Sequence, residues 1–193
     1  RITDCAGNSS TVVQTINVDD VTAPTASSPA PINVACWDEV PAPNVAVVTT
    51  EADECSLTGD LVVTHVSDSK TNVSCDGYEN GGFSFTRTYR ITDCAGNSST
   101  VNQTINVDDV TSPTASNPAT INVECWEEVP GPDVTVVNDE ADECSLTADL
   151  VVTHVSDSKT SATCADYANG GFSFTRTYRL TDCAGNTTDV DQI

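Results

Sequence analysis

The chain has 193 residues, and its 29 acidic side chains against 7 basic ones give a formal net charge of −22. An electrostatic field of that sign repels nucleic acid and anionic membranes, so we expect neither as a partner. Aromatic residues make up only 5% of the chain and methionine is absent, so any hydrophobic core must consist mainly of valine, isoleucine and leucine.

One short segment occurs three times. RITDCAGNSS stands at 1–10 and again at 90–99, and the near copy RLTDCAGNTT follows at 179–188. The spacing is 89 residues in both steps. Self-similarity at a fixed period indicates a tandem array of one module.

The repeat extends through the whole chain. Aligning 19–104 with 108–193 pairs 86 positions, of which 63 are identical. We interpret 1–18 as the end of a preceding module (the leading segment), 19–107 as a complete module (the first repeat) and 108–193 as a nearly complete one (the second repeat). We expect this sequence to be part of a longer protein.

The first repeat is predicted to contain only short strands. Proline-rich 22–31 predicts a linker that runs into a broken edge strand, where proline is tolerated. Alternation of apolar and polar residues is typical of strands and predicts them at 24–35, 44–50, 60–67, 83–92 and 99–107. No apolar period of 3.6 residues has a useful length. Six or seven short strands in about 89 residues suggest an all-β fold of tandem immunoglobulin-like β-sandwich modules.

Nine cysteines follow the same period. Even counts in small modules favour disulfides in an oxidising, extracellular setting. Zinc is the competing interpretation, but the cysteines lie about 20 residues apart and form no C-x-x-C pair. We predict two disulfides per repeat, made by Cys36, Cys55, Cys75 and Cys94 in the first and Cys125, Cys144, Cys164 and Cys183 in the second. Cys5 is expected to pair with a cysteine upstream of this sequence.

The strand directions of a sandwich place Cys55 and Cys94 at one end of the first repeat and Cys36 and Cys75 at the other. Bonded cysteines need Cα atoms within about 7 Å of each other. The topology therefore favours Cys55–Cys94 and Cys36–Cys75, with the equivalent pairs in the second repeat. The sequential alternative, Cys36–Cys55 with Cys75–Cys94, would have to connect opposite ends of the module.

The phrases DDVTAPTA, EADEC and RTYRITDCAGN resemble hyalin-repeat (HYR)-like, immunoglobulin-like modules. The resemblance is strongest in the pattern Tyr-x-x-Thr-Asp-x-x-Gly-Asn, which begins at Tyr89 and again at Tyr178. It is closest to tandem modules in long surface adhesins of Bacteroidetes, including those of gliding motility. The resemblance implies an extracellular, non-catalytic stalk or filament, exported by a type IX system and carried on the cell surface.

No catalytic constellation stands out. His65 and His154 lie in mid-strand, where a structural role is expected, and no second histidine completes a triad or a zinc site. Arg87 shares an apolar face and should pair with an acid or extend to solvent. We expect Trp37 and Trp126 to pack against a disulfide. The sequence therefore predicts no enzymatic activity.

Three classes of function remain: a structural stalk or filament, a glycan- or protein-binding module, and an accessory domain of a secreted enzyme. Near identity of the repeats favours the stalk, because a binding module should differ at its binding loops. The differences scatter except at 72–79 (NVSCDGYE against SATCADYA), the best candidate for a variable surface. The partners considered are neighbouring modules, other copies packed side by side in a fibre, and a glycan or surface ligand. No direct membrane insertion is expected.

Acidic residues should meet where one module follows another, because the linker faces two loops at the start of the next module. The residues expected there are Asp19, Asp20, Glu51, Asp53, Asp93 and Asn97 before the first repeat, and Asp108, Asp109, Glu140, Asp142, Asp182 and Asn186 before the second. Six to eight oxygen ligands suit Ca²⁺, which gives one interpretation, an inter-module calcium site. The other is that the acids are merely solvated, or that Asp93 shapes its own turn. The sequence leaves both open.

Overall fold

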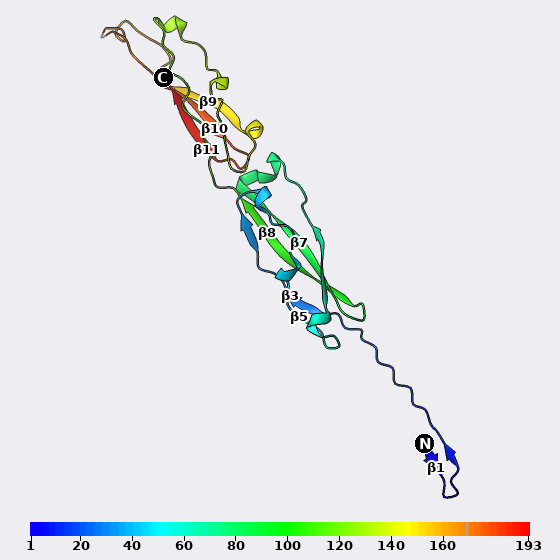
Figure 1. Ribbon diagram of the computed structural model, residues 1–193. Coiled ribbons are helices and arrows are strands. Elements are labelled where there is room, and N and C mark those ends of the chain that lie inside the picture. Colours follow the sequence, from blue (N-terminus) through cyan, green and yellow to red (C-terminus); the bar gives the residue numbers. More distant parts are fainter. Residues whose placement is uncertain (169) are drawn as a thin grey trace.

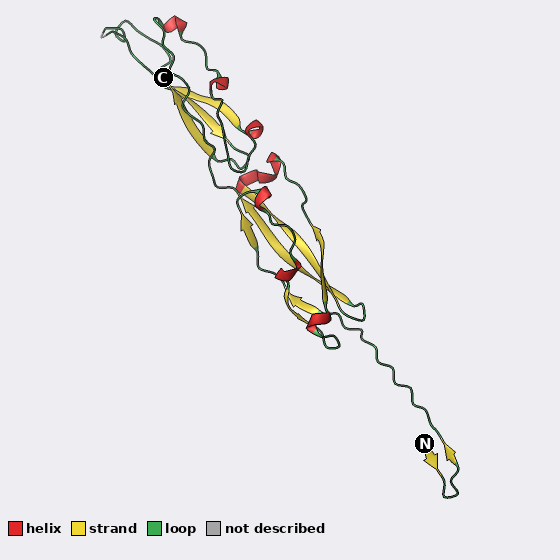
Figure 2. Cartoon of the chain, viewed as in Figure 1, coloured by secondary structure: helices red, strands yellow, loops and turns green. Residues whose placement is uncertain are grey.

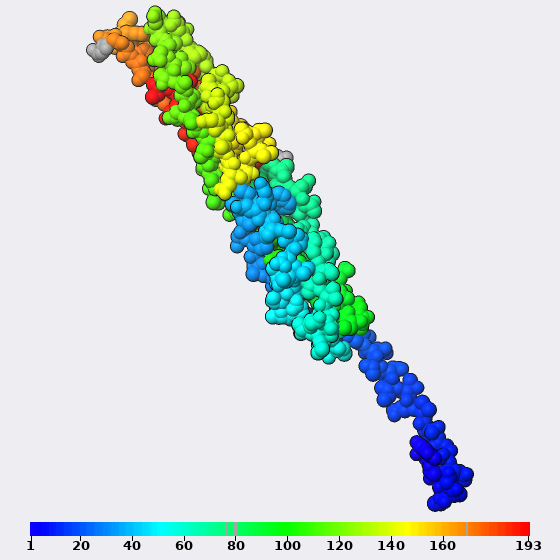
Figure 3. All heavy atoms as spheres, in the orientation of Figure 1, coloured from blue at the N-terminus to red at the C-terminus, as the bar shows by residue number. Residues whose placement is uncertain are grey.

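The computed structural model describes residues 1–168 and 170–193, apart from the side chains of Asp76, Glu79 and Asn80. The molecule is long and narrow (Figure 3), and the two repeats follow one another along its axis (Figure 1). The leading segment forms a small hairpin of β1 (Ile2–Thr3) and β2 (Ser9–Ser10). An extended linker joins this hairpin to the first repeat (Figure 1).

The described residues form strands and short 3₁₀ turns but no α-helix (Figure 2). The main sheet of the first repeat has the order β4-β8-β7-β6. Its strands are β4 (Ile32–Val34), β6 (Val62–Asp68), β7 (Gly82–Thr92) and β8 (Ser98–Asp108). β4 runs parallel to β8, and the other pairs are antiparallel. A second sheet pairs β3 (Thr25–Ser27) with β5 (Thr49–Ala52).

The long hairpin of β7 and β8 supplies most of the core. Its alternating pattern turns Tyr89, Ile91 and Ile105 inward, and all three are fully buried. Arg87 lies on the same face and is only 3% exposed. Its guanidinium donates to both carboxylate oxygens of Asp68 at 2.8–3.2 Å and to the Pro41 carbonyl at 2.9 Å. The charge is thus paired inside the module, as a buried arginine requires.

The sheet of the second repeat contains the equivalents of β8, β7 and β6. Its strands β9 (Val151–Asp157), β10 (Arg176–Thr181) and β11 (Thr187–Gln192) have the order β11-β10-β9. In the first repeat the start of β7 pairs with Ile105 and Val107 of β8. Residues 171–175, which precede β10, form no strand.

Short 3₁₀ turns link the strands. They are η1 (Trp37–Glu39), η2 (Val45–Val47), η3 (Thr58–Asp60) and η4 (Cys75–Gly81) in the first repeat, and η5 (Trp126–Glu128), η6 (Val134–Val136) and η7 (Thr147–Asp149) in the second.

The predicted strand at 44–50 is wrong over most of its length. Asn44 accepts a hydrogen bond from the Ala46 N–H at 3.0 Å and starts the turn η2, so the strand begins only at Thr49. Side-chain-to-backbone bonds of this kind compete with strand pairing. The predicted strand 24–35 is split into β3 and β4, with Pro29 buried between them.

Candidate functional site

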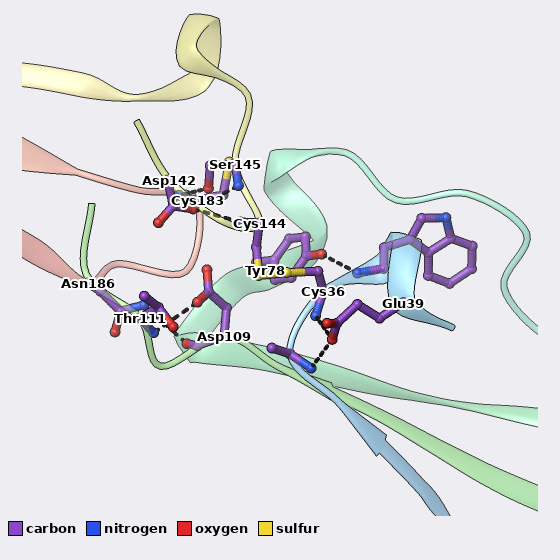
Figure 4. The surroundings of a disulfide bond; sticks show 12 residues. Cys36, Glu39, Tyr78, Asp109, Thr111, Asp142, Cys144, Ser145, Cys183 and Asn186 are labelled. Carbon is purple, nitrogen blue, oxygen red and sulfur yellow. Dashed lines mark hydrogen bonds between the residues drawn. A yellow bond between two sulfur atoms is a disulfide. The ribbon is translucent and has the colours of Figure 1, made fainter. Parts of the chain in front are cut away.

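Two disulfides join the two repeats, and the pairing predicted from the sequence is wrong. Cys36 bonds to Cys144 (Figure 4) and Cys75 bonds to Cys183. Each bond spans 108 residues of sequence, with Cα atoms 5.0 and 4.8 Å apart. The strand directions do place Cys36 and Cys75 near one end of the first repeat. That end faces the second repeat, so the geometric condition for bonding is met across the junction.

The predicted pairs Cys55–Cys94 and Cys125–Cys164 are also wrong for this chain. These four cysteines and Cys5 are exposed and unbonded among the described residues. Desolvation raises the pKa of the Cys55 thiol, and the nearby charges of Asp20 and Glu54 raise it further. The thiol form is therefore favoured over the reactive thiolate.

Apolar side chains cross the junction beside the disulfides. Tyr78, Phe85 and Ile105 form a buried cluster with Ala184 of the second repeat, and Trp37 packs against this cluster. The backbone N–H of Trp37 donates to the Tyr78 hydroxyl at 2.9 Å. The core of the first repeat is therefore completed by a residue of the second.

The expectation of an exposed variable surface at 72–79 holds for only part of the stretch. Asn72 and Ser74 are exposed, whereas Tyr78 is 5% exposed and Cys75 is bonded to the second repeat. The side chains of Asp76 and Glu79 lie outside the described residues.

Three aspartates meet at the same junction. Asp109 comes from the linker, Asp142 from the loop that carries Cys144, and Asp182 from the turn after β10. One carboxylate oxygen from each lies within 4.8 Å of the others. Asp109 is only 1% exposed and Asp182 only 6%, while Asp142 is half-buried. We call this group the junction cluster.

Each of these aspartates uses one oxygen to hold its own loop. Asp109 Oδ1 accepts the Thr111 N–H at 3.0 Å. Asp142 Oδ1 accepts the N–H groups of Cys144 and Ser145 at 3.0 and 2.8 Å (Figure 4). Such bonds from an aspartate to the backbone a few residues on are typical of tight turns.

Asp182 acts in the same way in its turn, where its Oδ1 accepts the Asn186 N–H at 2.8 Å. Gly185 in this turn has φ +90°, a conformation that glycine adopts without steric cost. The second oxygen, Oδ2, of Asp109, Asp142 and Asp182 is buried without a hydrogen-bond partner among the described residues.

The junction cluster concentrates negative charge. Burial raises the pKa of Asp109, and the charges of Asp142, Asp182 and Glu143 raise it further. The ion pairs of the second repeat that the structure describes involve Asp157, Asp166 and Asp189, none of which belongs to the cluster. The three carboxylates therefore have no basic partner in the described part of the chain.

A second group, the outer cluster, holds the equivalent residues Asp20, Asp53 and Asp93. The Asn97 amide donates to the Asp20 carbonyl at 3.2 Å and to Asp93 Oδ2 at 3.0 Å. In this cluster only Asp53 Oδ1 is buried without a partner among the described residues.

Six of the twelve residues predicted as metal ligands thus lie in the two clusters. Asn97 and Asn186 instead bind the linker backbone through their side-chain amides, at 3.2 and 3.1 Å. The four residues outside both clusters are Asp19, Glu51, Asp108 and Glu140.

Asp93 also does what the alternative interpretation predicted, because its Oδ1 accepts the Asn97 N–H at 2.8 Å. Burial acts to raise the pKa of Asp93, but hydrogen bonds from Asn97 and from the turn backbone hold it below its ordinary value. The same residue therefore shapes its turn and contributes an oxygen to the cluster.

No helical segment among the described residues has the length and hydropathy needed to span a bilayer. A search among curated proteins returns no match. Residues 24–107 match the family model of the HYR-like domain with 4 cysteines. The resemblance to HYR-like modules is therefore confirmed for the first repeat, which is similar to this four-cysteine domain over nearly its whole length.

Proposed function

We propose that the chain is a stalk or filament segment of a long extracellular bacterial surface adhesin, built from tandem immunoglobulin-like modules. The observation that carries this proposal is the pair of bridges Cys36–Cys144 and Cys75–Cys183. A stalk must transmit force along its length. Two covalent links at one junction, added to the peptide linker, oppose both extension and bending. The proposed segment is non-catalytic.

The strand arrangement supports an immunoglobulin-like sandwich. The first strand region changes sheets, because β3 pairs with β5 while β4 pairs with β8. Strands that pass from one sheet to the other close the corners of packed sheets. Val48, next to β5, packs against Tyr89 and Ile91 of the main sheet, so both sheets contribute to one core.

The same junction can be repeated at both ends of the chain. Cys55 and Cys94 stand beside the outer cluster as Cys144 and Cys183 stand beside the junction cluster. Cys125 and Cys164 are equivalent to Cys36 and Cys75. We therefore infer that these exposed cysteines bond to further modules of the array. Disulfides and a match to an HYR-like family also suggest an extracellular location.

An exposed hollow at the far end of the second repeat fits this proposal better than it fits a glycan or protein ligand. It is lined by Trp126, Tyr167 and Phe172. Tyr167 is 42% exposed, whereas the equivalent Tyr78 is 5% exposed in a core cluster with Ile105 and Val107 of its own repeat and Ala184 of the second. By analogy with Ala184, we infer that a further module covers part of this hollow. Bacteroidetes as the source, gliding motility and side-by-side association of stalks belong to the proposal.

Disulfide mapping of the secreted protein tests the proposal. The protein would be purified without reductant, blocked with a thiol reagent, digested and analysed by mass spectrometry. The segments ACWDE at Cys36 and ECWEE at Cys125 differ in sequence, so their peptides can be told apart. We expect Cys36 linked to Cys144. A peptide linking Cys36 to Cys75 would overturn the proposed junction.

A further inference from the structure

We propose that the junction cluster of Asp109, Asp142 and Asp182 is a binding site for Ca²⁺ that ties the linker to both loops of the second repeat. This site does not depend on the stalk function, because it would form in any protein that contains this junction.

Burial of unsatisfied oxygens is the first argument. A buried acceptor without a partner costs about 1–3 kcal/mol, and more when the group is charged. The cluster holds three such oxygens, and two of their residues, Asp109 and Asp182, are more than nine-tenths buried. A divalent cation between them would satisfy all three oxygens at once and neutralise most of their charge.

A comparison of three copies of one turn shows that the free oxygen of Asp182 is not a property of the turn itself. In the other copies an asparagine amide occupies the second carboxylate oxygen, at 2.9 Å in Asp4 and 3.0 Å in Asp93. The Asn97 amide also donates to the Asp20 carbonyl at 3.2 Å. At the junction the equivalent Asn186 amide keeps, among the described residues, only this bond to the linker, to the Asp109 carbonyl at 3.1 Å. Asp182 Oδ2 is left free at the place where the other two carboxylates arrive.

The choice of ion follows from the donors and their spacing. All three donors are carboxylate oxygens. The neighbouring Cys144 and Cys183 form disulfides with cysteines of the first repeat, so the thiolates that zinc prefers are absent from the described junction. Ca²⁺ binds oxygens at 2.3–2.6 Å, so oxygens around one ion can be separated by up to about 5 Å. The 4.8 Å limit of the cluster fits this spacing. Mg²⁺ needs shorter bonds and a stricter octahedron.

The position of the site gives the ion a structural task. Asp182 directly precedes Cys183, and Asp142 lies two residues before Cys144. Asp109 belongs to the linker that enters the second repeat, and its N–H donates to the Gly81 carbonyl of the first repeat at 2.9 Å. An ion bound here would hold the linker and both disulfide-bearing loops in one arrangement.

Calcium titration of the oxidised 193-residue chain tests the proposal. We expect a heat of binding by calorimetry and a melting temperature several degrees higher in Ca²⁺ than in chelator. Asp109→Asn should remove the junction response to Ca²⁺. In chelator its melting temperature should equal or exceed that of the unaltered chain, because the amide keeps the shape and removes one repelling charge.

Two matched variants complete the design. Asp108→Asn changes the exposed neighbour of Asp109 and should keep the full response to Ca²⁺. Asp20→Asn changes the outer cluster and should leave the tightest binding step intact. The proposal is overturned if the unaltered chain shows no heat and no thermal shift. It is equally overturned if Asp109→Asn still binds with the original affinity while Asp20→Asn does not.

Discussion

The junction cluster and the outer cluster contain the same aspartates on the same loops, yet their surroundings differ. The loop EADECSLT is identical at 51–58 and 140–147. Asp20 is half-buried, whereas the equivalent Asp109 is 1% exposed. The outer cluster has one buried oxygen without a partner among the described residues, and the junction cluster has three.

Since the loops are identical, the difference must come from what packs against them. At the junction cluster this is the end of the first repeat, held by two disulfides and by the Tyr78–Ala184 contact. The buried arrangement of the acids is therefore not a property of one repeat alone. Contact with the preceding repeat buries the linker aspartate Asp109 and leaves two more carboxylate oxygens without a partner among the described residues.

Removing both disulfides should have the largest effect on the difference in burial between the junction cluster and the outer cluster. In Cys36→Ser/Cys75→Ser the junction is held only by the linker and the apolar contact. A loop of about 100 residues closed by one disulfide stabilises by about 4.7 kcal/mol in the chain-entropy model, and the second, overlapping loop adds less. Denaturant unfolding should show the loss in the second repeat, and amide exchange at 109–111 should accelerate.

The matched control is Cys55→Ser/Cys94→Ser, which changes two exposed, unbonded cysteines. Its unfolding should be unaltered in this chain. Equal losses in the two double variants would show that the bridges do not account for the difference between the clusters.

Substitution of the buried arginines should lower the free energy of unfolding by the same amount in both repeats. Arg87 binds Asp68 and the Pro41 carbonyl, and Arg176 binds Asp157 and the Pro130 carbonyl in the same way. Breaking a buried ion pair from one side costs about 3–5 kcal/mol. We expect Arg87→Met and Arg176→Met to lose about 3 kcal/mol each in denaturant unfolding. A clear inequality would mean that the repeats differ inside their cores as well as at the junction.

Part of this architecture follows from the sequence pattern and part does not. Alternation alone located β6, β7 and β8 to within two residues of their observed ends, because these strands pack one face on the core. The prediction of a strand at 44–50 is wrong because the Asn44 side chain accepts a hydrogen bond from the backbone two residues further on. The hydrophobic pattern does not show this bond. The pairing of Arg87 with an acid was one of the two outcomes expected, although its partner Asp68 was not identified.

At the junction the sequence predicted which loops meet but not which cysteines bond. Strand directions correctly brought Asp109, Asp142 and Asp182 together. The same directions bring Cys36 and Cys75 to the end of one repeat and Cys144 and Cys183 to the facing end of the next. Strand directions within one module do not distinguish a bond inside that module from a bond across the junction. How closely two ends meet depends on packing, which the sequence pattern does not show.

Gly82→Ala should lower the free energy of unfolding by about 1–3 kcal/mol, the usual range for overpacking. Gly82 lies beside Asp108, where the chain leaves the first repeat for the linker. A Cβ at Gly82 would lie 2.2 Å from the Val107 carbonyl oxygen and 2.8 Å from the Asp108 Cα. The backbone just before Asp109 would have to move. Thermal unfolding measures the cost, and Gly59→Ala, where a Cβ meets nothing within 4 Å, is the control. Equal stability of both variants would contradict the close approach.

Acid should weaken the ion pair of each buried arginine, by less than the arginine substitutions do. Hydrogen bonds from Arg176 lower the pKa of Asp157, although its burial acts in the opposite direction. A folded-state pKa below the unfolded value means that the stabilisation is present above about pH 3.9 and is lost as the pH falls through the folded-state pKa. Denaturant midpoints should decline below about pH 4, and Arg176→Met should show a shallower decline. An unchanged slope in that variant would contradict this assignment.

The smallest effect should separate two tyrosines with the same hydrogen bond. Tyr78 accepts the Trp37 N–H at 2.9 Å and is 5% exposed, whereas Tyr167 accepts the Trp126 N–H at 3.1 Å and is 42% exposed. Tyr78→Phe leaves the N–H without an acceptor beside the core and should cost about 1 kcal/mol. In Tyr167→Phe water can replace the hydroxyl, so the cost should fall within a few tenths of a kcal/mol. Denaturant unfolding of the two variants measures the difference. Equal costs would show that water reaches the Tyr78 hydroxyl, and the burial assigned to the cluster around Tyr78 would then be wrong.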